Sequence, residues 1–166
     1  MVRVKRIVIA LFLLGIAILV GVRVLPSEEK RVERQFKLLS KLVSKPPDES
    51  PITSAARVHK LRALFAEKCR LDTHLSWLSG DFTGEELASL IARTRLQFST
   101  LSLRLYDLNV EFPGEDSAVA RLTARAKGTT TDGELFDESH ELECLLEKTD
   151  GKWLFREAEV VEVLER

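Results

Sequence analysis

Four stretches between Arg104 and Leu164 alternate apolar and polar residues. The breaks between them carry turn residues: Phe112-Pro-Gly-Glu-Asp116, Gly128-Thr-Thr-Thr-Asp-Gly133 and Thr149-Asp-Gly-Lys152. Alternation with period two, interrupted by Pro-Gly and Asp-Gly, is typical of antiparallel strands joined by tight turns. The pattern therefore predicts an antiparallel meander of four strands with one buried face.

Helices are predicted ahead of these strands. One apolar stripe at spacings of four, three and four predicts a helix over about residues 28–44: Val32, Phe36, Leu39 and Val43. After the Pro-rich connector Lys45–Ser50, a second helix is expected from Ser50 to about Arg70. A capping box formed by Thr83 and Glu86 begins a third helix.

This order of elements predicts an α+β fold, in which helices pack on a curved antiparallel sheet. The domain is expected over residues 50–166. Residues 26–49 are interpreted as a juxtamembrane amphipathic helix followed by the connector.

The start of the chain predicts a membrane anchor. Residues 7–22 carry no charge, and a helix counted to Leu25 matches a hydrocarbon core of about 30 Å. We interpret residues 1–25 as an uncleaved signal-anchor that contacts the membrane through residues 7–25, with a cleaved signal peptide as the alternative. The basic residues near Met1 place the N-terminus in the cytoplasm and the domain outside it, in the periplasm if the source is a bacterium.

Charge and cysteine content narrow the classes of partner. Residues 1–70 hold fifteen Lys and Arg against six Asp and Glu, and residues 71–166 hold ten against twenty. An acidic domain argues against nucleic acid as a partner. Neither Cys69 nor Cys144 has CxxC spacing or clustered histidines, so no metal site or cofactor is expected. The two cysteines could form a disulfide outside the cytoplasm or remain buried free thiols.

The last strand carries apolar residues at positions of both parities. Trp153 and Phe155 share one parity, and Leu154 and Val160 share the other. A strand that is apolar on both faces is covered on both sides, so Trp153 and Phe155 are predicted to contact a protein partner or a second copy of the chain.

One segment near the C-terminus resembles a known superfamily. Glu147-Lys-Thr-Asp-Gly-Lys-Trp153-Leu-Phe-Arg-Glu-Ala-Glu-Val160 is similar to the final hairpin of nuclear transport factor 2-like proteins, the SnoaL-like or cystatin-like cones. With the order of elements, the resemblance covers roughly residues 50–166. It implies a cone of helices and curved sheet, in which the enzymes of the superfamily place acids, bases and tyrosines.

Inward-facing polar residues would carry any chemistry in such a cone. By parity, the expected pocket-lining residues are Tyr106, His140 and Arg156. Tyr106 would donate a hydrogen bond to an oxyanion, with Asp72 or His74 at the mouth as the base. A single tyrosine on the buried face of a strand is, however, more often part of the core.

The buried face is otherwise poor in ionisable groups. The sequence is therefore interpreted as a membrane-anchored binding or scaffolding domain without catalytic activity, with a homodimer or a protein partner bound through the sheet. The alternative is a small-molecule isomerase, dehydratase or hydrolase that uses the Tyr106 hydroxyl with Asp72 or His74.

Overall fold

The computed structural model describes residues 27–73 and 78–161. Its elements, in chain order, are α2 (Glu28–Val43), α3 (Pro51–Arg62), β1 (Phe65–Asp72), β2 (Gly80–Phe82), α4 (Gly84–Leu96), β3 (Phe98–Gly114), β4 (Ser117–Thr130), β5 (Leu135–Thr149) and β6 (Lys152–Val161). Over these residues, no helix is both long and apolar enough to span a bilayer. The predicted anchor, residues 1–25, lies outside the described residues, so the membrane location stays a prediction.

Contacts divide the chain into two units, Met1–Arg31 and Val32–Arg166. In the described part of the first unit, Arg31 Nη1 pairs with Glu28 Oε1 at 2.9 Å within the first turns of α2. The second unit holds the sheet and the remaining helices, and the fold is described for that unit.

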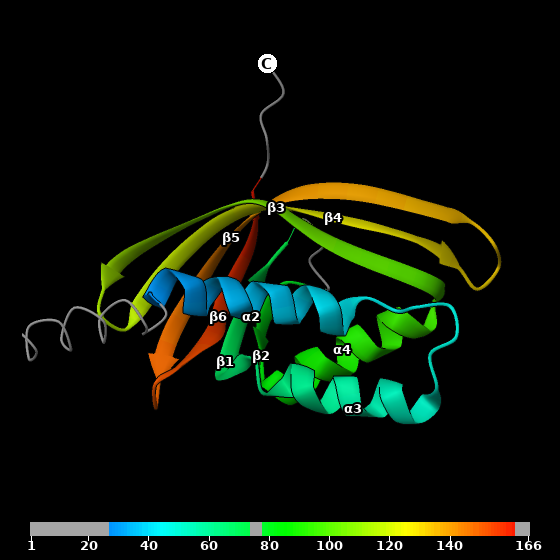
Figure 1. The fold of residues 1–166 in the computed structure, drawn as a ribbon, viewed down its shortest axis with the longest axis horizontal. Coiled ribbons are helices and arrows are strands. Elements are labelled where there is room, and N and C mark those ends of the chain that lie inside the picture. The colour runs from blue at the N-terminus through cyan, green and yellow to red at the C-terminus, as the bar shows by residue number, and fades with distance from the viewer. Residues whose placement is uncertain (1–26, 74–77, 162–166) are drawn as a thin grey trace, which may run out of the picture. The chain divides into compact units, whose positions relative to one another are not determined.

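One six-stranded sheet, in the order β2-β1-β6-β5-β4-β3, forms the framework of the second unit. The four strands from β3 to β6 are joined by hairpins, as the alternation predicts. β1 pairs with β6 in parallel, so the sheet is mixed and not wholly antiparallel. Figure 1 shows the sheet curving over the helices. We call the face that the helices cover the inner face.

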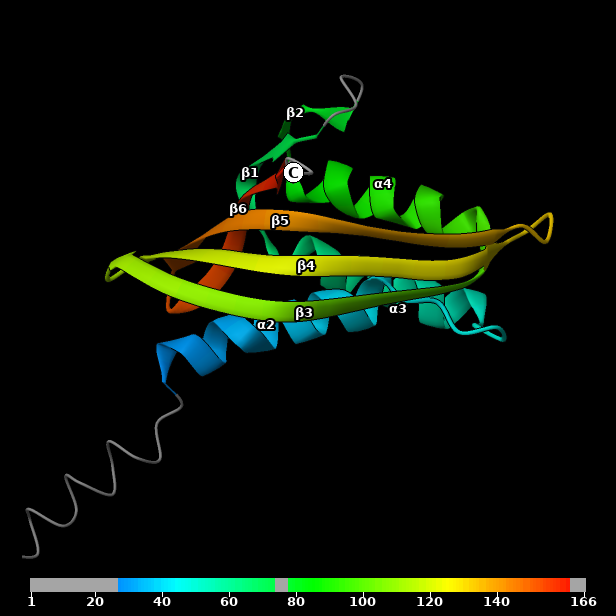
Figure 2. The ribbon, with the colours of Figure 1, turned by 90° about the horizontal axis from the view of Figure 1, so that it is seen from above.

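The hydrophobic core lies between this inner face and the helices. It joins residues from helices and strands far apart in the sequence: Val32, Phe36 and Leu42 of α2, Leu61 of α3, Ala88 of α4, and Ala118, Leu146, Trp153 and Phe155 of the sheet. The small side chains Ala118 and Ala120 on β4 let the helices approach the sheet closely. In projection on the sheet, α3 lies between α2 and α4 (Figure 2).

The second helix is shorter than predicted. It ends at Arg62, and residues 65–70, which were expected to continue it, belong to β1 (Phe65–Asp72). Leu64, Ala66 and Cys69 are buried in this strand and the turn before it, and β1 itself pairs with β6 on one side and with β2 on the other. The apolar positions suited both a helix and a strand, and tertiary packing decides between them.

The predicted capping box is present at the start of α4. Thr83 Oγ1 accepts a hydrogen bond from Glu86 N at 3.2 Å, and Glu86 Oε2 accepts one from Thr83 N at 2.7 Å. Hydrogen bonds from the Thr83 backbone and side chain lower the pKa of Glu86, because they favour its charged form. The capping box therefore fixes the first turn of α4.

Two bulges change which residues of β3 and β6 face the core. The β3–β4 register shifts between Tyr106 and Asn109, where Asp107 has a φ of 54°. Leu105 and Leu108 therefore both pack against the core, although their positions differ in parity. In β6, Arg156 is the extra residue, since Phe155 pairs with Leu146 and Glu157 pairs with Leu145.

Candidate functional site

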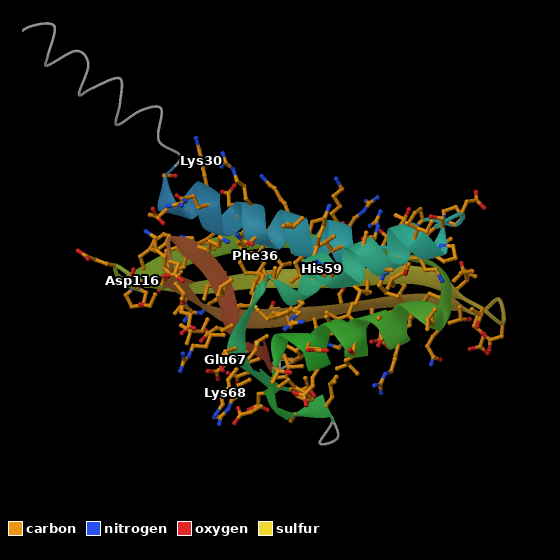
Figure 3. All side chains as sticks on the ribbon, turned by 90° about the horizontal axis from the view of Figure 1, so that it is seen from below. Lys30, Phe36, His59, Glu67, Lys68 and Asp116 are labelled. Carbon is orange, nitrogen blue, oxygen red and sulfur yellow. The ribbon has the colours of Figure 1, made fainter. Side chains whose placement is uncertain are left out.

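A groove between α3 and α4 is the largest hollow described here, with a volume of about 630 Å³. Figure 3 shows the two helices side by side beneath the sheet. The walls are mainly small and apolar: Pro51, Ala55 and Val58 on α3, and Ala88, Ala92 and Leu96 on α4. A concave apolar site of this size suits a small organic molecule. We call it the α3–α4 groove.

Polar side chains also line this groove. They come from the connector, from α3 and from α4: Lys45, Glu49, Ser54, His59, Arg62, Glu85, Ser89 and Arg95. Arg62 Nη1 and Glu85 Oε2 lie 3.5 Å apart and form an ion pair across the groove, with more than half of each side chain exposed. His59 and Arg62 are three residues apart on one helix, so their side chains are neighbours. An imidazole therefore lies beside an ion pair over an apolar wall.

A buried ion network closes one end of the groove. Both Glu49 carboxylate oxygens accept hydrogen bonds of 2.7 Å from Arg95 Nη2, and Arg57 Nε lies 2.8 Å from Glu49 Oε1. The side chains of Arg95 and Glu49 are 2% and 1% exposed. The carboxylate thus has two guanidinium partners, and burial of the charged groups is compensated.

Arg95 and Lys45 also satisfy the ends of two helices. Arg95 donates from Nε to the Val43 carbonyl at 3.0 Å and from Nη2 to the Ser44 carbonyl at 3.3 Å, at the C-terminus of α2. Lys45 Nζ donates to the Arg95 carbonyl in the last turn of α4 and to the Phe98 carbonyl at the start of β3. These reciprocal caps fix the connector between α2 and α3, which carries Glu49.

Parity predicted that Tyr106 lines a pocket on the inner face, and this prediction is wrong. The bulge turns it toward the outer face of the sheet, where it is 41% exposed. Asp72 is at the end of β1, in a shallow hollow with Arg70 and Asp81. β1 and β3 are four strand spacings apart, about 19 Å along the sheet, and Tyr106 and Asp72 line no common hollow among those that contain either residue's strand neighbours. His74 lies outside the described residues.

The other two predicted pocket residues are also on the surface. His140 Nε2 lies 3.3 Å from Glu138 Oε2, and both side chains are more than half exposed. Arg156, displaced by the bulge in β6, pairs with Glu147 and is 57% exposed. Neither residue lies on the α3–α4 groove.

Trp153 and Phe155 belong to the core and not to a partner surface. They are 1% and 3% exposed. The Phe155 ring meets the Phe36 ring edge-on with centroids 5.0 Å apart, and the Trp153 ring lies 5.7 Å from the Phe112 ring. The strand looked two-faced because the bulge at Arg156 reverses the parity after it. Association through the sheet stays a prediction, without these two residues as its contacts.

Cys69 and Cys144 are buried free thiols, the second of the two predicted alternatives. They lie on β1 and β5, which flank β6, so their Cα atoms are two strand spacings apart, about 10 Å. A disulfide requires less than about 7 Å. Burial raises the pKa of Cys69 to about 11 and that of Cys144 to about 12.

We expect both thiols to be inert in the native protein. At pH 8 the raised pKa values suppress the thiolate, so labelling by Ellman's reagent should be at least about a hundredfold slower than that of free cysteine. Unfolding in guanidinium chloride should release two rapidly reacting thiols. Above pH 9 the unfolded thiols ionise first, so stability should fall as the pH rises. Fast labelling of either cysteine in the folded chain would contradict this account.

Sequence reasoning missed the groove residues. His59 lies on α3 with Ala55 and Arg62 at helical spacing, beside the stripe that contains the buried Leu61. Ala88, Ser89 and Ala92 form a matching row of small residues on α4. These two rows were the available signal, but only the packing of α3 beside α4 shows that they face each other. Among residues 27–73 and 78–161, no three His, Cys, Asp or Glu side chains gather to hold a metal ion.

Comparison with known proteins finds similarity of structure. No family model and no curated protein matches the chain. A candidate scytalone dehydratase from Novosphingobium aromaticivorans DSM 12444 is 19% identical, with a TM-score of 0.63 over 82% of this chain and 85% of that chain. The hexachlorocyclohexane dehydrochlorinase LinA-type3 from Novosphingobium barchaimii LL02 is 12% identical, with a TM-score of 0.64 over 81% and 86%.

A protein with a cystatin-like fold from Caulobacter vibrioides is 11% identical, with a TM-score of 0.59 over 81% of this chain and 89% of that chain. Two of these neighbours carry the names of enzymes, which speaks against the predicted non-catalytic binding or scaffolding domain. The chain has an α+β fold with helices on a curved mixed sheet, and it shares this fold with these solved structures.

Proposed function

We propose that the chain is a small-molecule lyase or isomerase that removes a proton from carbon in the α3–α4 groove, with His59 as the general base. The observation that carries the proposal is the position of the His59 imidazole in an apolar groove of about 630 Å³, beside the Arg62–Glu85 ion pair. Imidazole accepts protons at neutral pH, and a base held beside its substrate acts at high effective concentration.

The groove suits an elimination in particular. His59 takes a proton from one carbon, and the electron pair of that C–H bond forms the new double bond. The bond from the adjacent carbon to the leaving group breaks, and the leaving group departs with its electron pair. Arg62 and Ser89 supply donors that stabilise the departing anion at the groove wall. The names dehydratase and dehydrochlorinase of two structural neighbours both describe losses of this kind.

Isomerisation requires the same base. If the substrate lacks a leaving group, protonated His59 returns the proton to a different carbon, and the double bond has moved. The apolar walls, with Ala55, Ala92 and Leu96, favour a substrate with little charge. The predicted site of Tyr106 with Asp72 has no place in this mechanism.

Filling the groove should reduce turnover without unfolding the chain. Ala92 is a half-buried wall residue, so Ala92→Trp places an indole where the substrate would lie. The assay follows elimination of 5-nitrobenzisoxazole by full-length protein in a nonionic detergent. In this probe a base removes the C–H proton, the N–O bond breaks, and an absorbing phenolate forms. We expect a loss of at least about tenfold in kcat/KM, since the base and the probe can no longer meet.

The matched control is Ala56→Trp, an exposed position of α3 that does not line the groove. It should retain wild-type turnover, and both variants should keep the wild-type urea midpoint. Equal turnover in wild type, Ala92→Trp and Ala56→Trp would place the reaction elsewhere and refute the proposed site.

A further inference from the structure

A second hollow, of about 410 Å³, lies where the end of α2 meets the edge strand β3. Its lining residues come from α2, the connector, α3 and two strands: Lys41, Ser44, Lys45, Pro46, Arg57, Thr100, Leu101, Ser102 and Lys127. Four of these residues are cationic, and none is a carboxylate. We call it the Lys41 hollow.

Backbone pairing gives this hollow a fixed frame. Lys45 and Leu101 exchange hydrogen bonds of 2.7 and 2.9 Å, which join the connector to the edge of β3. The Ser44 hydroxyl accepts a hydrogen bond from Leu103 N at 3.0 Å, and the Ser40 hydroxyl donates one to Leu103 O at 2.6 Å. The connector and the strand edge are therefore held together before any ligand binds.

The cations on the α2 side are not fully neutralised. Among the described residues, Lys41 forms no ion pair, and its side chain is exposed at the rim. Arg57 shares the single carboxylate of Glu49 with Arg95. Two guanidinium groups against one carboxylate leave a positive charge at this wall, and Lys45 adds a further charge while its ammonium caps α4.

On the β4 side of the hollow, the cations also outnumber the carboxylates. Lys127 Nζ lies 2.9 Å from Asp137 Oδ2, but Arg125 also binds that carboxylate through Nε at 2.8 Å and Nη2 at 2.9 Å. One carboxylate again serves two cations. Hydrogen bonds from Arg125 and Lys127 hold the pKa of Asp137 well below its usual range, so the arrangement persists across the physiological pH range.

Hydroxyl groups also line the hollow. Thr100 and Ser102 are two residues apart on β3, and Ser102 pairs with Lys127 across the β3–β4 register. Both residues are half-buried. Two hydroxyl donors beside ammonium groups on two walls form a set that suits the tetrahedral oxygens of a phosphate group.

We propose that the Lys41 hollow binds a phosphate group, carried by a small phosphorylated molecule or by a phospholipid headgroup. Both sources present an anionic phosphate, which an excess of cations with no lining carboxylate attracts. The hollow is larger than one phosphate, which leaves room for the group attached to it. This site shares only Lys45 with the lining of the α3–α4 groove, and its test does not depend on catalysis.

The test uses isothermal titration of full-length protein in a nonionic detergent with two probes. One is inorganic pyrophosphate, and the other is dihexanoylphosphatidylglycerol below its micelle concentration. Lys41→Gln should raise the Kd of the bound probe by about five- to tenfold, because one ammonium is removed from the rim without breaking an ion pair. Raising the NaCl concentration should weaken binding by wild type.

The matched control is Lys68→Gln, which removes the same charge from an exposed position of β1, four strands away from β3 (Figure 3). Binding of pyrophosphate that is weakened by Lys41→Gln and not by Lys68→Gln supports the site with a soluble phosphate as its ligand. The same pattern with only the phosphatidylglycerol supports a lipid headgroup. No binding of either probe, or equal weakening by both variants, would overturn the proposal.

Discussion

Replacement of Arg95 by Met should destabilise the fold by about 3–5 kcal/mol, the cost of removing one partner from a buried ion pair. The Glu49 carboxylate, 1% exposed, would keep Arg57 but lose the bidentate contact of Arg95. The Val43 carbonyl at the end of α2 would lose its donor as well, and the Ser44 carbonyl would keep only the hydrogen bond from Arg57 Nη1. Urea unfolding followed by circular dichroism measures the change.

Two variants identify the cause of that loss. Arg93→Met removes an exposed arginine from the same turn of α4 and should leave the urea midpoint close to that of wild type. The double variant Arg95→Met/Glu49→Leu removes the buried carboxylate that has lost one of its two guanidinium partners, so it should be more stable than Arg95→Met alone. A double variant less stable than the single one would show that packing, and not the poorly compensated charge, dominates the effect.

The hairpins of β3 to β6 and the capping box of α4 could be predicted because both depend on residues near each other in the sequence. Asp150-Gly151 and the Thr83–Glu86 pair each specify a local backbone geometry. The helix over residues 28–44 is observed as Glu28–Val43, because a stripe of apolar residues defines it.

The orientation of side chains on the sheet could not be predicted in the same way. A count of parity assumes an unbroken pleat, and the bulges near Asp107 and Arg156 break it. The count therefore placed Tyr106 in a pocket, and it assigned Trp153 and Phe155 to a partner surface. No residue at either bulge marks it in the sequence, since the usual signal, a glycine, is absent.

The candidate site could not be predicted from the sequence for a different reason. The α3–α4 groove exists because two helices, separated in sequence by β1 and β2, pack side by side. Neither His59 on α3 nor Ser89 on α4 belongs to a local motif. The expected site, Tyr106 with Asp72, followed from the resemblance to a superfamily of cones and from parity, and the sheet keeps those residues apart.

His59→Gln should reduce the elimination of 5-nitrobenzisoxazole by about 10²- to 10⁴-fold, the range expected for loss of a positioned general base. The glutamine amide retains the length and polarity of the side chain but does not accept a proton at neutral pH. Since His59 is exposed, the variant should fold as wild type does. The loss should be in kcat, while KM stays near its wild-type value, because the groove walls still bind the probe.

The most direct test of the account compares the initial rate of this elimination in wild type, His59→Gln and His140→Gln at neutral pH. His140 is an exposed histidine on β5 that does not line the groove, so its replacement controls for proton transfer by any surface imidazole. The account predicts wild-type turnover in His140→Gln and a loss of at least about a hundredfold in His59→Gln. Equal rates in His59→Gln and wild type would contradict it.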